Sequence, residues 1–292
     1  SAYPGVIATL FDLRDAEILY GKGTPERYDH SYTFIRGLVH IPLSAQYHSL
    51  TVKHWKFLDT NIRASGNYRA SYMLEERDFL ETLGATFEEE EWVVVKTTGR
   101  LSSLARVTKN LYQKRMEYMV NVNSLEQLVK NILASIYGIT YEATDLFEEE
   151  TEVTRVGYRG GEFFNPIYAC VITARTRLQL AEACVEVEKA GGVPILAMTD
   201  CLYYEGTKEM FPERLWEKGK VLGRFEEPSE YKDMICLGAG RYEYYDVKGK
   251  YYAKQRGLNV KGLELELKEK FTWKKTMQKM AREKTSKLNV TA

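Results

Sequence analysis

Asp200 is the residue around which chemistry can be argued first, because it is the only acid within a long apolar and aromatic segment until Glu205. Residues 193–206 read V-P-I-L-A-M-T-D-C-L-Y-Y-E-G. An apolar run, a short polar break and an aromatic run predict a strand–turn–strand hairpin with the acid at its tip. A strand of this kind rarely carries a carboxylate unless that carboxylate is paired or binds a metal. Asp200 is therefore a candidate metal ligand.

A second candidate lies in residues 130–138, which read K-N-I-L-A-S-I-Y-G. On a helix, Lys130, Ala134 and Tyr137 share one face, since positions i, i+4 and i+7 line up. A cation and an aromatic ring on one face could hold a triphosphate and a base. An ordinary amphipathic helix with one exposed lysine explains the same pattern, so these residues alone leave both interpretations open.

The overall charge does not point to a partner, because Lys+Arg and Asp+Glu both total 41 among 292 residues. The distribution is more informative. Residues 261–292 contain nine basic and four acidic side chains, whereas acidic runs occupy 88–91 and 148–150. A polyanion would favour the C-terminal end and avoid the acidic runs. A solvated helix face is the alternative for any one of these stretches.

Cysteine and hydropathy patterns exclude other classes. The four cysteines form no C-x-x-C pair, and the four histidines lie far from them in sequence. This argues against a zinc site or a disulfide framework and favours reduced thiols in a cytoplasm, that of a host cell if the source is viral. No stretch approaches about 18 uninterrupted apolar residues, so we expect no membrane partner.

The first half of the chain is predicted to mix strands with a helical pair. Strand-like residues are 5–11, after the Pro4-Gly5 turn signal, together with 32–43, 67–73 and 87–96. A helix over 103–120 and a second over 125–138 are joined by a short turn, which predicts an αα-hairpin. Asn123-Ser124 suits the N-cap of the second helix.

The second half contains the longest predicted helix and the Asp200 hairpin. A strand is expected at 153–158, and Asn165-Pro166 opens a helix that ends at Gly191-Gly192. Tyr203 and Tyr204, after Asp200, are expected to pack in a sheet. Residues 236–256 alternate and are rich in tyrosine, which predicts β structure, and 262–288 predict a basic helix. Separate strands and helices indicate an α+β fold.

Three segments together resemble motifs of family B DNA polymerases, in the order that the family has them. Residues 130–138 resemble K-x-x-x-N-S-x-Y-G, the Asp200 hairpin resembles Y-x-D-T-D-S, and Ser1-Ala2-Tyr3-Pro4 resembles the end of D-x-x-S-L-Y-P. Asn165-Pro166 and Ile172-Thr173-Ala174-x-x-Arg177 also look like the family's helix before the catalytic hairpin. The similarity is greatest to phage and protein-primed members and covers nearly the whole chain.

This resemblance implies a polymerase right hand without an exonuclease domain. The palm has an antiparallel sheet, the fingers are a helical hairpin and the thumb is small. The corresponding ranges are 1–100 for the N-terminal part of the palm with an insertion, 101–140 for the fingers, 141–235 for the palm with the catalytic hairpin, and 236–292 for the thumb. In protein-primed relatives an insertion at the position of 30–100 contacts a priming protein, which is a possible partner here.

The resemblance also assigns roles to residues. Asp200 would bind two Mg²⁺ ions that activate the primer 3′-hydroxyl and steady the departing pyrophosphate. Lys130 and Arg115 would contact the triphosphate of a dNTP, Tyr137 would lie under the nascent base pair, and Tyr3 would block a 2′-hydroxyl. Backbone N–H groups of Ser1, Ala2 and Tyr3 would hold phosphate oxygens. Contacts to primer–template DNA are assigned to Gly138, Thr199, Arg241, Tyr242, Lys274 and Lys275.

Several positions depart from the family pattern. Met198 stands where the hairpin usually has a first Asp, Ala134 replaces the Asn of the second motif, and Gly240 replaces the Lys of a K-x-Y element, where Arg241 could compensate. The Asp of the first motif would lie three residues before Ser1. Because two metal ions need two carboxylates, we expect an upstream polypeptide, which would also carry the exonuclease, to supply this Asp.

Two other hypotheses explain the same sequence. The chain could be a polymerase-derived subunit that binds DNA or acts as a scaffold without catalysis, as the residues at 198 and 134 suggest. It could also be a different nucleotide-binding α+β enzyme, in which case three ordered motifs would have arisen by chance. Mg²⁺-dependent nucleotide incorporation, with Asp200→Asn as a control, discriminates among them.

Overall fold

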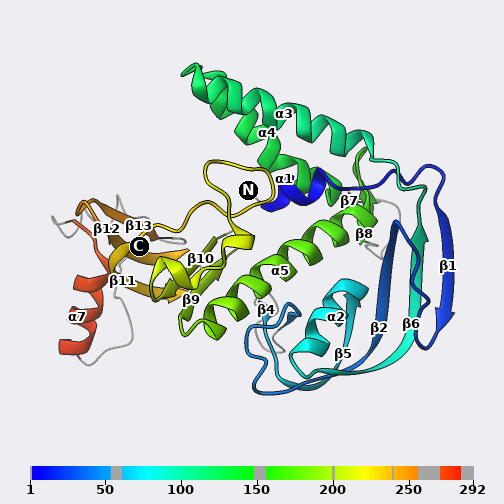
Figure 1. Ribbon diagram of the computed structural model, residues 1–292, viewed down its shortest axis with the longest axis horizontal. Helices are drawn as coiled ribbons and strands as arrows, with labels where there is room; N and C mark the ends of the chain where they lie inside the picture. The colour runs from blue at the N-terminus through cyan, green and yellow to red at the C-terminus, as the bar shows by residue number, and fades with distance from the viewer. Residues whose placement is uncertain are drawn as a thin grey trace.

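The computed structural model describes residues 2–53, 61–147, 156–198, 201–238, 240–255 and 270–283. These residues form helices and antiparallel sheets that follow one another along the chain rather than alternating as βαβ units, as expected for an α+β fold. The largest sheet, the helical pair and the C-terminal sheet surround one long helix, α5 (Pro166–Lys189) (Figure 1).

The largest sheet has four antiparallel strands in the order β1-β6-β2-β5. Its strands are β1 (Glu17–Lys22), β2 (Ser31–Ile41), β5 (Gly66–Met73) and β6 (Thr86–Lys96). Alternate residues of β2 are buried, including Ile35, Val39 and Ile41, so one face of the sheet packs on a core. Helix α2 (Leu74–Thr82) lies against that face, between the sheet and α5 (Figure 1).

The strands predicted at 32–43, 67–73 and 87–96 are confirmed to within two residues at either end. Strand β1 and helix α2 were not predicted. Most of β1 is exposed, so its sequence lacks the apolar alternation that marks a half-buried strand. Helix α2 has charged residues at three of its first four positions and few apolar ones. The short strands β3 (Val52–Lys53) and β4 (Asn61–Ile62) have no sequence signal.

The predicted αα-hairpin is confirmed as α3 (Ser103–Val120) and α4 (Leu125–Thr140). Ser102 caps α3, since its Oγ accepts a hydrogen bond from the backbone N–H of Ala105 at 3.0 Å. The Oδ1 of Asn123 likewise accepts from the N–H of Leu125 at 2.9 Å, so that Asn123, rather than Ser124, satisfies the start of α4. The pair projects away from the other elements (Figure 1).

Helix α5 is the central element of the fold, and 12 of its 24 residues are buried. It begins as predicted, because the Oδ1 of Asn165 accepts from the N–H of Tyr168 at 3.0 Å and Pro166 occupies the first turn. It contacts α1, α2, α4, β9 and β10. Elements from distant parts of the sequence are therefore fixed relative to one helix.

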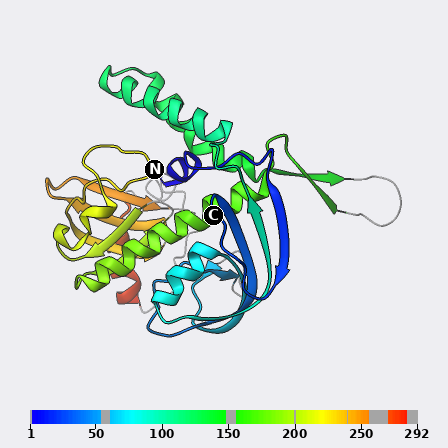
Figure 2. The same cartoon turned by 45° about the vertical axis from the view of Figure 1, so that its right-hand side comes forward.

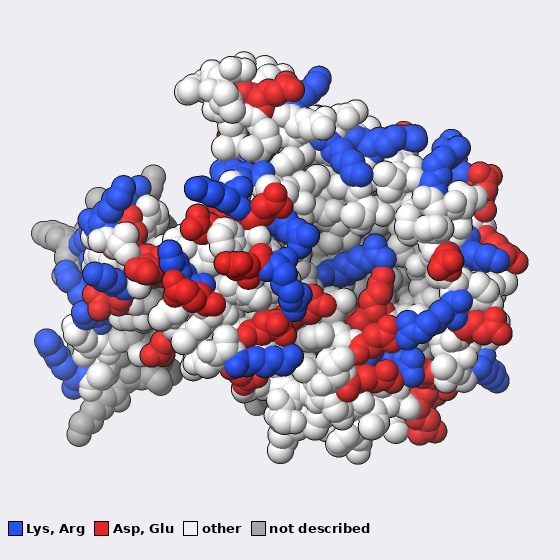
Figure 3. All heavy atoms as spheres, in the orientation of Figure 1, with Lys and Arg blue, Asp and Glu red and all other residues white. Residues whose placement is uncertain are grey.

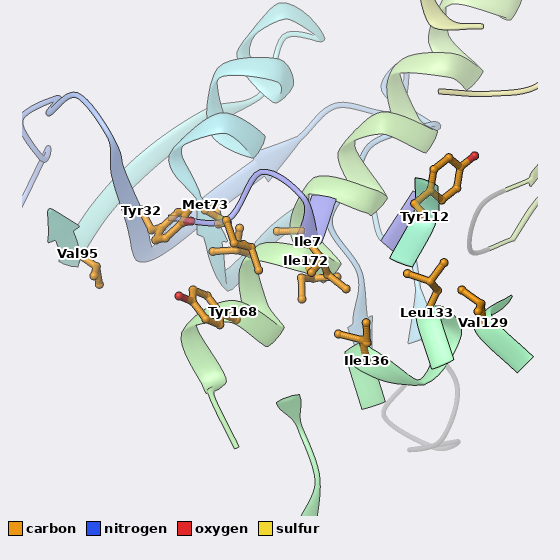
Figure 4. Packing of buried hydrophobic residues seen from close by; sticks show 13 residues of the cluster. Ile7, Tyr32, Met73, Val95, Tyr112, Val129, Leu133, Ile136, Tyr168 and Ile172 are labelled. Atoms are coloured by element: carbon orange, nitrogen blue, oxygen red, sulfur yellow. The ribbon is translucent and has the colours of Figure 1, made fainter. Parts of the chain in front are cut away.

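The prediction of a strand at 5–11 is wrong. The segment Ala2–Ile7 forms helix α1, followed by a turn. A short apolar run cannot be distinguished from a buried helical turn by periodicity alone. Ile7 and Leu10 are fully buried against α5 and the helices of the αα-hairpin, and this tertiary packing determines the helix. Figure 4 shows Ile7 next to Ile172 of α5.

The remaining elements form a hairpin and a small sheet beside α5. Strands β9 (Val193–Met198) and β10 (Cys201–Glu205) form the predicted antiparallel hairpin. Strands β11 (Tyr231–Gly238), β12 (Arg241–Asp246) and β13 (Tyr251–Gln255) form the tyrosine-rich sheet, which begins five residues earlier than expected. Helix α7 (Trp273–Glu283) confirms part of the basic helix predicted at 262–288. Residues 270–272 are not helical, and the rest of the predicted range lies outside the described residues.

Between α4 and α5 the chain forms a second hairpin of β7 (Ala143–Phe147) and β8 (Val156–Gly160), which extends away from the other elements (Figure 2). The predicted strand at 153–158 falls partly outside the described residues, and β8 covers the part that is described. Strand β7 was not predicted. Within the described ranges, none of the helices is long and apolar enough to cross a lipid bilayer.

Candidate functional site

The ring of Tyr3 stacks on the ring of Tyr137, with centroids 4.7 Å apart and planes inclined by 29°. Tyr3 belongs to α1 and Tyr137 to α4, so the stack joins two candidate motifs that lie more than 130 residues apart in sequence. Burial raises the pKa of the Tyr137 phenol, and the neighbouring Tyr3 adds to the shift. The Tyr137 phenol therefore stays neutral at physiological pH.

The hydrophobic core beneath this stack fixes the two rings. Ile7 of α1, Leu133 and Ile136 of α4, and Ile172 of α5 pack together, and Tyr3 and Tyr137 lie against this cluster. Figure 4 shows Ile7 beside Ile172, with Leu133 and Ile136 on the neighbouring α4. The stack is thus supported by side chains from three helices rather than by a loop.

Arg115 is buried between the two helices of the hairpin, with 8% of its surface exposed. Its Nε donates a hydrogen bond to Oε1 of Glu126 at 2.8 Å. Arg115 is the main cause that lowers the pKa of the Glu126 carboxyl, so this carboxylate stays ionised at neutral pH. Lys130 lies one turn after Glu126 on α4 and is exposed. The two predicted phosphate ligands therefore lie on neighbouring helices around one carboxylate.

Asp200 and Thr199 lie outside the described residues, as does Ser1, so the structure places only the strands that lead to the hairpin tip. Met198 ends β9 and pairs with Cys201, which begins β10. The Sδ of Met198 accepts a hydrogen bond from the N–H of Gly240 at 3.1 Å. The segment that starts at Gly240, where a K-x-Y element was expected, is therefore adjacent to the end of β9.

The other predicted DNA contacts differ in exposure. Arg241 is exposed, whereas Tyr242 is 6% exposed and its ring lies 5.3 Å from that of Tyr203. The expectation that Tyr203 packs in a sheet is confirmed by this cluster. A methyl group at Gly138 would meet no atom within 4 Å, so the surface there is open. On the face shown in Figure 3, both signs of charge are interspersed and no single basic patch marks a DNA path.

Lys274 and Lys275 are exposed in the first turn of α7, and a buried carboxylate holds that turn. Glu243 of β12 is 3% exposed, and its two oxygens accept the backbone N–H groups of Trp273 at 2.6 Å and of Lys274 at 2.9 Å. The hydroxyl of Tyr251 donates to it as well, at 2.8 Å. Sequence reasoning missed Glu243, although an acid flanked by tyrosines in a predicted strand was a usable signal.

A second buried carboxylate joins the large sheet to α5. Glu76 of α2 is 1% exposed and receives a hydrogen bond from Nη2 of Arg177 at 3.1 Å. Burial raises the pKa of Glu76, while Arg177 and the N–H of Met73 oppose the shift. Arg177 was noted in the sequence as part of a motif, but its partner was not predicted, because the two residues are 101 positions apart.

The described residues give limited support to a metal site. Among them, no three His, Cys, Asp or Glu side chains converge. The sulfur atoms of Met198 and Cys201, which flank the hairpin tip, are soft donors unsuited to Mg²⁺. A carboxylate that suits Mg²⁺, that of Asp200, lies between them in sequence, outside the described residues.

Comparisons with known proteins found no match in sequence, either to a family model or to a curated protein. Solved structures do match. A Phi29 DNA polymerase in an orthorhombic crystal form has a TM-score of 0.60 and 17% identity over 89% of this chain and 50% of that one. The fold is similar to that of Phi29 DNA polymerase.

Two further structures of Phi29 DNA polymerase agree. The complex with primer–template DNA has a TM-score of 0.57 and 16% identity, covering 93% of this chain and 50% of that chain. The ternary complex with primer–template DNA and incoming nucleotides has a TM-score of 0.61 and 15% identity, covering 94% and 51%. The chain thus spans about half the length of these polymerases, and the likeness shows that it shares the fold of part of Phi29 DNA polymerase.

Proposed function

We propose that this chain forms the palm, fingers and thumb of a template-directed DNA polymerase of the phage and protein-primed type. The observation that carries the proposal is the stack of Tyr3 on Tyr137. Two segments that resemble separate polymerase motifs, and that are distant in sequence, meet at one place. The similarity in fold to Phi29 DNA polymerase, including its complex with DNA and nucleotides, supports the proposal.

In this proposal the stacked tyrosines line the site of the nascent base pair. A flat, apolar ring surface suits a base because aromatic stacking stabilises a base without reading its identity. Tyr137 would lie beneath the pair, and Tyr3 would exclude a ribose with a 2′-hydroxyl. The backbone N–H groups of Ser1, Ala2 and Tyr3 would face the phosphates of the dNTP.

Arg115 and Lys130 would bind the triphosphate. A buried guanidinium gives directional hydrogen bonds to phosphate oxygens, whereas a lysine contributes a point charge. Since Arg115 is held within the helical pair, a rigid-body movement of α3 and α4 would carry both cations together. We therefore assign residues 101–140 to the fingers.

Asp200 is the proposed catalytic carboxylate, and its oxygens would hold Mg²⁺. The ions would neutralise charge on the primer 3′-oxygen and on the departing pyrophosphate. A second carboxylate is required to hold two ions, and Met198 cannot supply it. A priming protein is a further proposed partner.

Contacts to the primer–template duplex would come from two regions. Gly138, Thr199 and Arg241 lie on segments around the hairpin and α4, where they would face the primer end. Lys274 and Lys275 would contact phosphates of the duplex from α7, which we assign to a thumb at 236–292. Such contacts are independent of base sequence and weaken with salt. Residues 1–100 and 141–235 would form the palm.

Formation of a ternary complex tests this function without requiring catalysis. The chain is incubated with a dideoxy-terminated primer–template and each of the four dNTPs, and the complex is followed by gel shift in the presence of a heparin competitor. The proposal predicts that only the dNTP complementary to the template base stabilises the complex. Equal behaviour of all four dNTPs contradicts it.

The substitutions at two motif positions favour a second candidate, a scaffold that binds DNA without catalysis. Met198 and Ala134 replace an acid and an amide that the family uses. In this case the chain would bind the primer–template, and no dNTP would stabilise the complex. The same gel shift therefore separates the two candidates.

A further inference from the structure

Residues 216–225, here called the strap, follow the β9–β10 hairpin and cross between α1, α3 and α5. Three contacts hold the strap. The Tyr112 hydroxyl of α3 donates to the backbone oxygen of Lys220 at 2.9 Å, and Nε2 of Gln179 in α5 donates to that of Gly223 at 2.8 Å. The backbones of Gly223 and Gly5 are so close that a Cβ on Gly5 would lie 2.2 Å from the Cα of Gly223.

The first of these contacts places the backbone of Lys220 against α3 of the helical hairpin. Tyr112 precedes Arg115 by three residues, so the hydroxyl that fixes the Lys220 backbone comes from the same side of α3. The positive charges of Arg115, Lys130 and Lys220 all act on the Glu126 carboxyl and lower its pKa, with Arg115 the largest cause. Arg115 is thus hydrogen-bonded to this carboxylate, and Lys130, one turn along α4, and Lys220, on the strap, act on it as further positive charges.

We propose that Arg115, Lys130 and Lys220 form a three-cation site for the triphosphate of a nucleotide, and that Glu126 occupies the place of a phosphate when the nucleotide is absent. The inference rests on the proposed function and deepens it by adding a ligand from the strap and an internal counter-ion. Neither Lys220 nor Glu126 belongs to one of the three segments that resemble polymerase motifs.

The geometry explains why a carboxylate is present among phosphate ligands. The side chain of Arg115 is 10% exposed, and a buried guanidinium without an anion is costly. The side chain of Glu126 is 24% exposed, so it can turn towards solvent when a phosphate replaces it. Exchange of one anion for another leaves Arg115 paired throughout. Because an anion must displace Glu126 in order to bind, a weakly charged anion is expected to bind this site with low affinity.

Binding of inorganic tripolyphosphate to the full chain tests the site directly, by isothermal titration calorimetry at fixed ionic strength. Lys220→Gln is compared with Lys218→Gln, which removes an equal charge from the same strap. We expect the Kd for tripolyphosphate to rise about threefold to tenfold for Lys220→Gln, the effect of one charged hydrogen bond, and to change less than twofold for Lys218→Gln. Equal effects of the two variants overturn the proposal, because general electrostatics would then explain both.

Glu126→Gln tests the internal counter-ion, with Glu117→Gln on the neighbouring helix as its control. If Glu126 competes with phosphate, its removal lowers the Kd for tripolyphosphate by threefold or more, whereas Glu117→Gln has a smaller effect. If Glu126 only positions Arg115, the Kd rises, and the proposal is overturned. Thermal melting of each variant shows that it is folded.

Failure of the site and failure of the polymerase function give different results. Tight, Lys220-dependent binding of tripolyphosphate without template-directed dNTP binding supports the three-cation site and contradicts the polymerase function. Template-directed dNTP binding that is unchanged in Lys220→Gln keeps the polymerase and rejects the three-cation site.

Discussion

Glu76 and Arg177 form an ion pair in which the carboxylate is buried and the guanidinium is partly exposed. The two atoms Oε1 and Nη2 are 3.1 Å apart, and the Glu76 side chain is 1% exposed against 38% for Arg177. The pair joins α2, which lies against one face of the four-stranded sheet, to α5, which leads into the hairpin. The sheet and the proposed catalytic hairpin are therefore connected through one helix.

Arg177→Met is expected to lower the free energy of unfolding by about 2 kcal/mol or more, because it leaves an unpaired carboxylate in the core. The penalty depends on pH. Without Arg177 the pKa of Glu76 in the folded state lies further above the ordinary value of 4.5, so the folded protein binds the proton more readily. The loss is therefore largest near pH 7 and shrinks as the pH falls towards 4.5. Urea unfolding at several pH values measures it.

Arg175→Met provides the matched control for that experiment. Arg175 pairs with Glu75 on the same two helices, but the Glu75 side chain is 39% exposed. An exposed ion pair contributes less than about 1 kcal/mol, so this variant should lose little stability at any pH. Equal losses for the two arginines contradict the view that burial of Glu76 decides the effect.

Glu243→Ala should loosen the start of α7, because two backbone N–H groups and a tyrosine hydroxyl lose their acceptor. We expect a loss of about 1–2 kcal/mol and faster hydrogen exchange at the amides of Trp273 and Lys274, measured by mass spectrometry of peptic fragments. If α7 contacts DNA, affinity for duplex falls as well. Glu243→Gln keeps an acceptor and should show a smaller effect on both. Unchanged exchange in Glu243→Ala contradicts the capping role.

His48 makes the protein sensitive to acid, because its ring is 1% exposed and burial lowers its pKa from 6.5 to about 4. Below pH 6.5 the unfolded state binds a proton that the folded state does not, so stability falls as the pH drops from 6.5 towards 4. The contribution is about 2 kcal/mol between pH 7 and pH 5. His48→Leu should flatten this part of the pH profile, whereas His40→Gln at an exposed position should not. Identical slopes in both variants contradict the assignment.

Tyr3→Ala should admit ribonucleotides if Tyr3 lies at the sugar of the incoming nucleotide. We expect discrimination between dNTP and rNTP to fall by tenfold or more, with Tyr3→Phe close to wild type because the ring is kept. Competitive incorporation or ternary-complex formation with each nucleotide measures the ratio. Loss of dNTP binding in Tyr3→Ala without any change in the ratio argues that the ring only packs on Tyr137.

The sequence predicted those elements whose signals are local. The helices α3, α4 and α5 have N-cap residues at their starts and apolar residues at helical spacing, and the hairpin at Asp200 has two apolar strands around a polar turn. Helix α1 was mistaken for a strand because its packing against α5 and α4, not its own pattern, determines its conformation. The α+β class followed from the order of the elements.

The candidate site was predicted less completely than the fold. The motifs placed Tyr3 and Tyr137 in related roles, and the structure brings their rings together. Glu76, Glu126 and Glu243 were missed, because each is defined by a partner distant in sequence or on a neighbouring helix. Charged residues of this kind carry no periodic signal, and one sequence does not show which arginine or helix start each will meet.

Single-nucleotide incorporation at a primer terminus is the most direct test of whether this chain carries a polymerase site that depends on Asp200. The chain, alone and with a polypeptide that supplies a second carboxylate, is mixed with primer–template DNA, the complementary dNTP and Mg²⁺, and extension is followed on a gel. We predict Mg²⁺-dependent extension that is lost in Asp200→Asn. Extension is kept in the control Asp29→Asn, because Asp29 is an exposed acid in a loop before β2. Extension that survives in Asp200→Asn would contradict it.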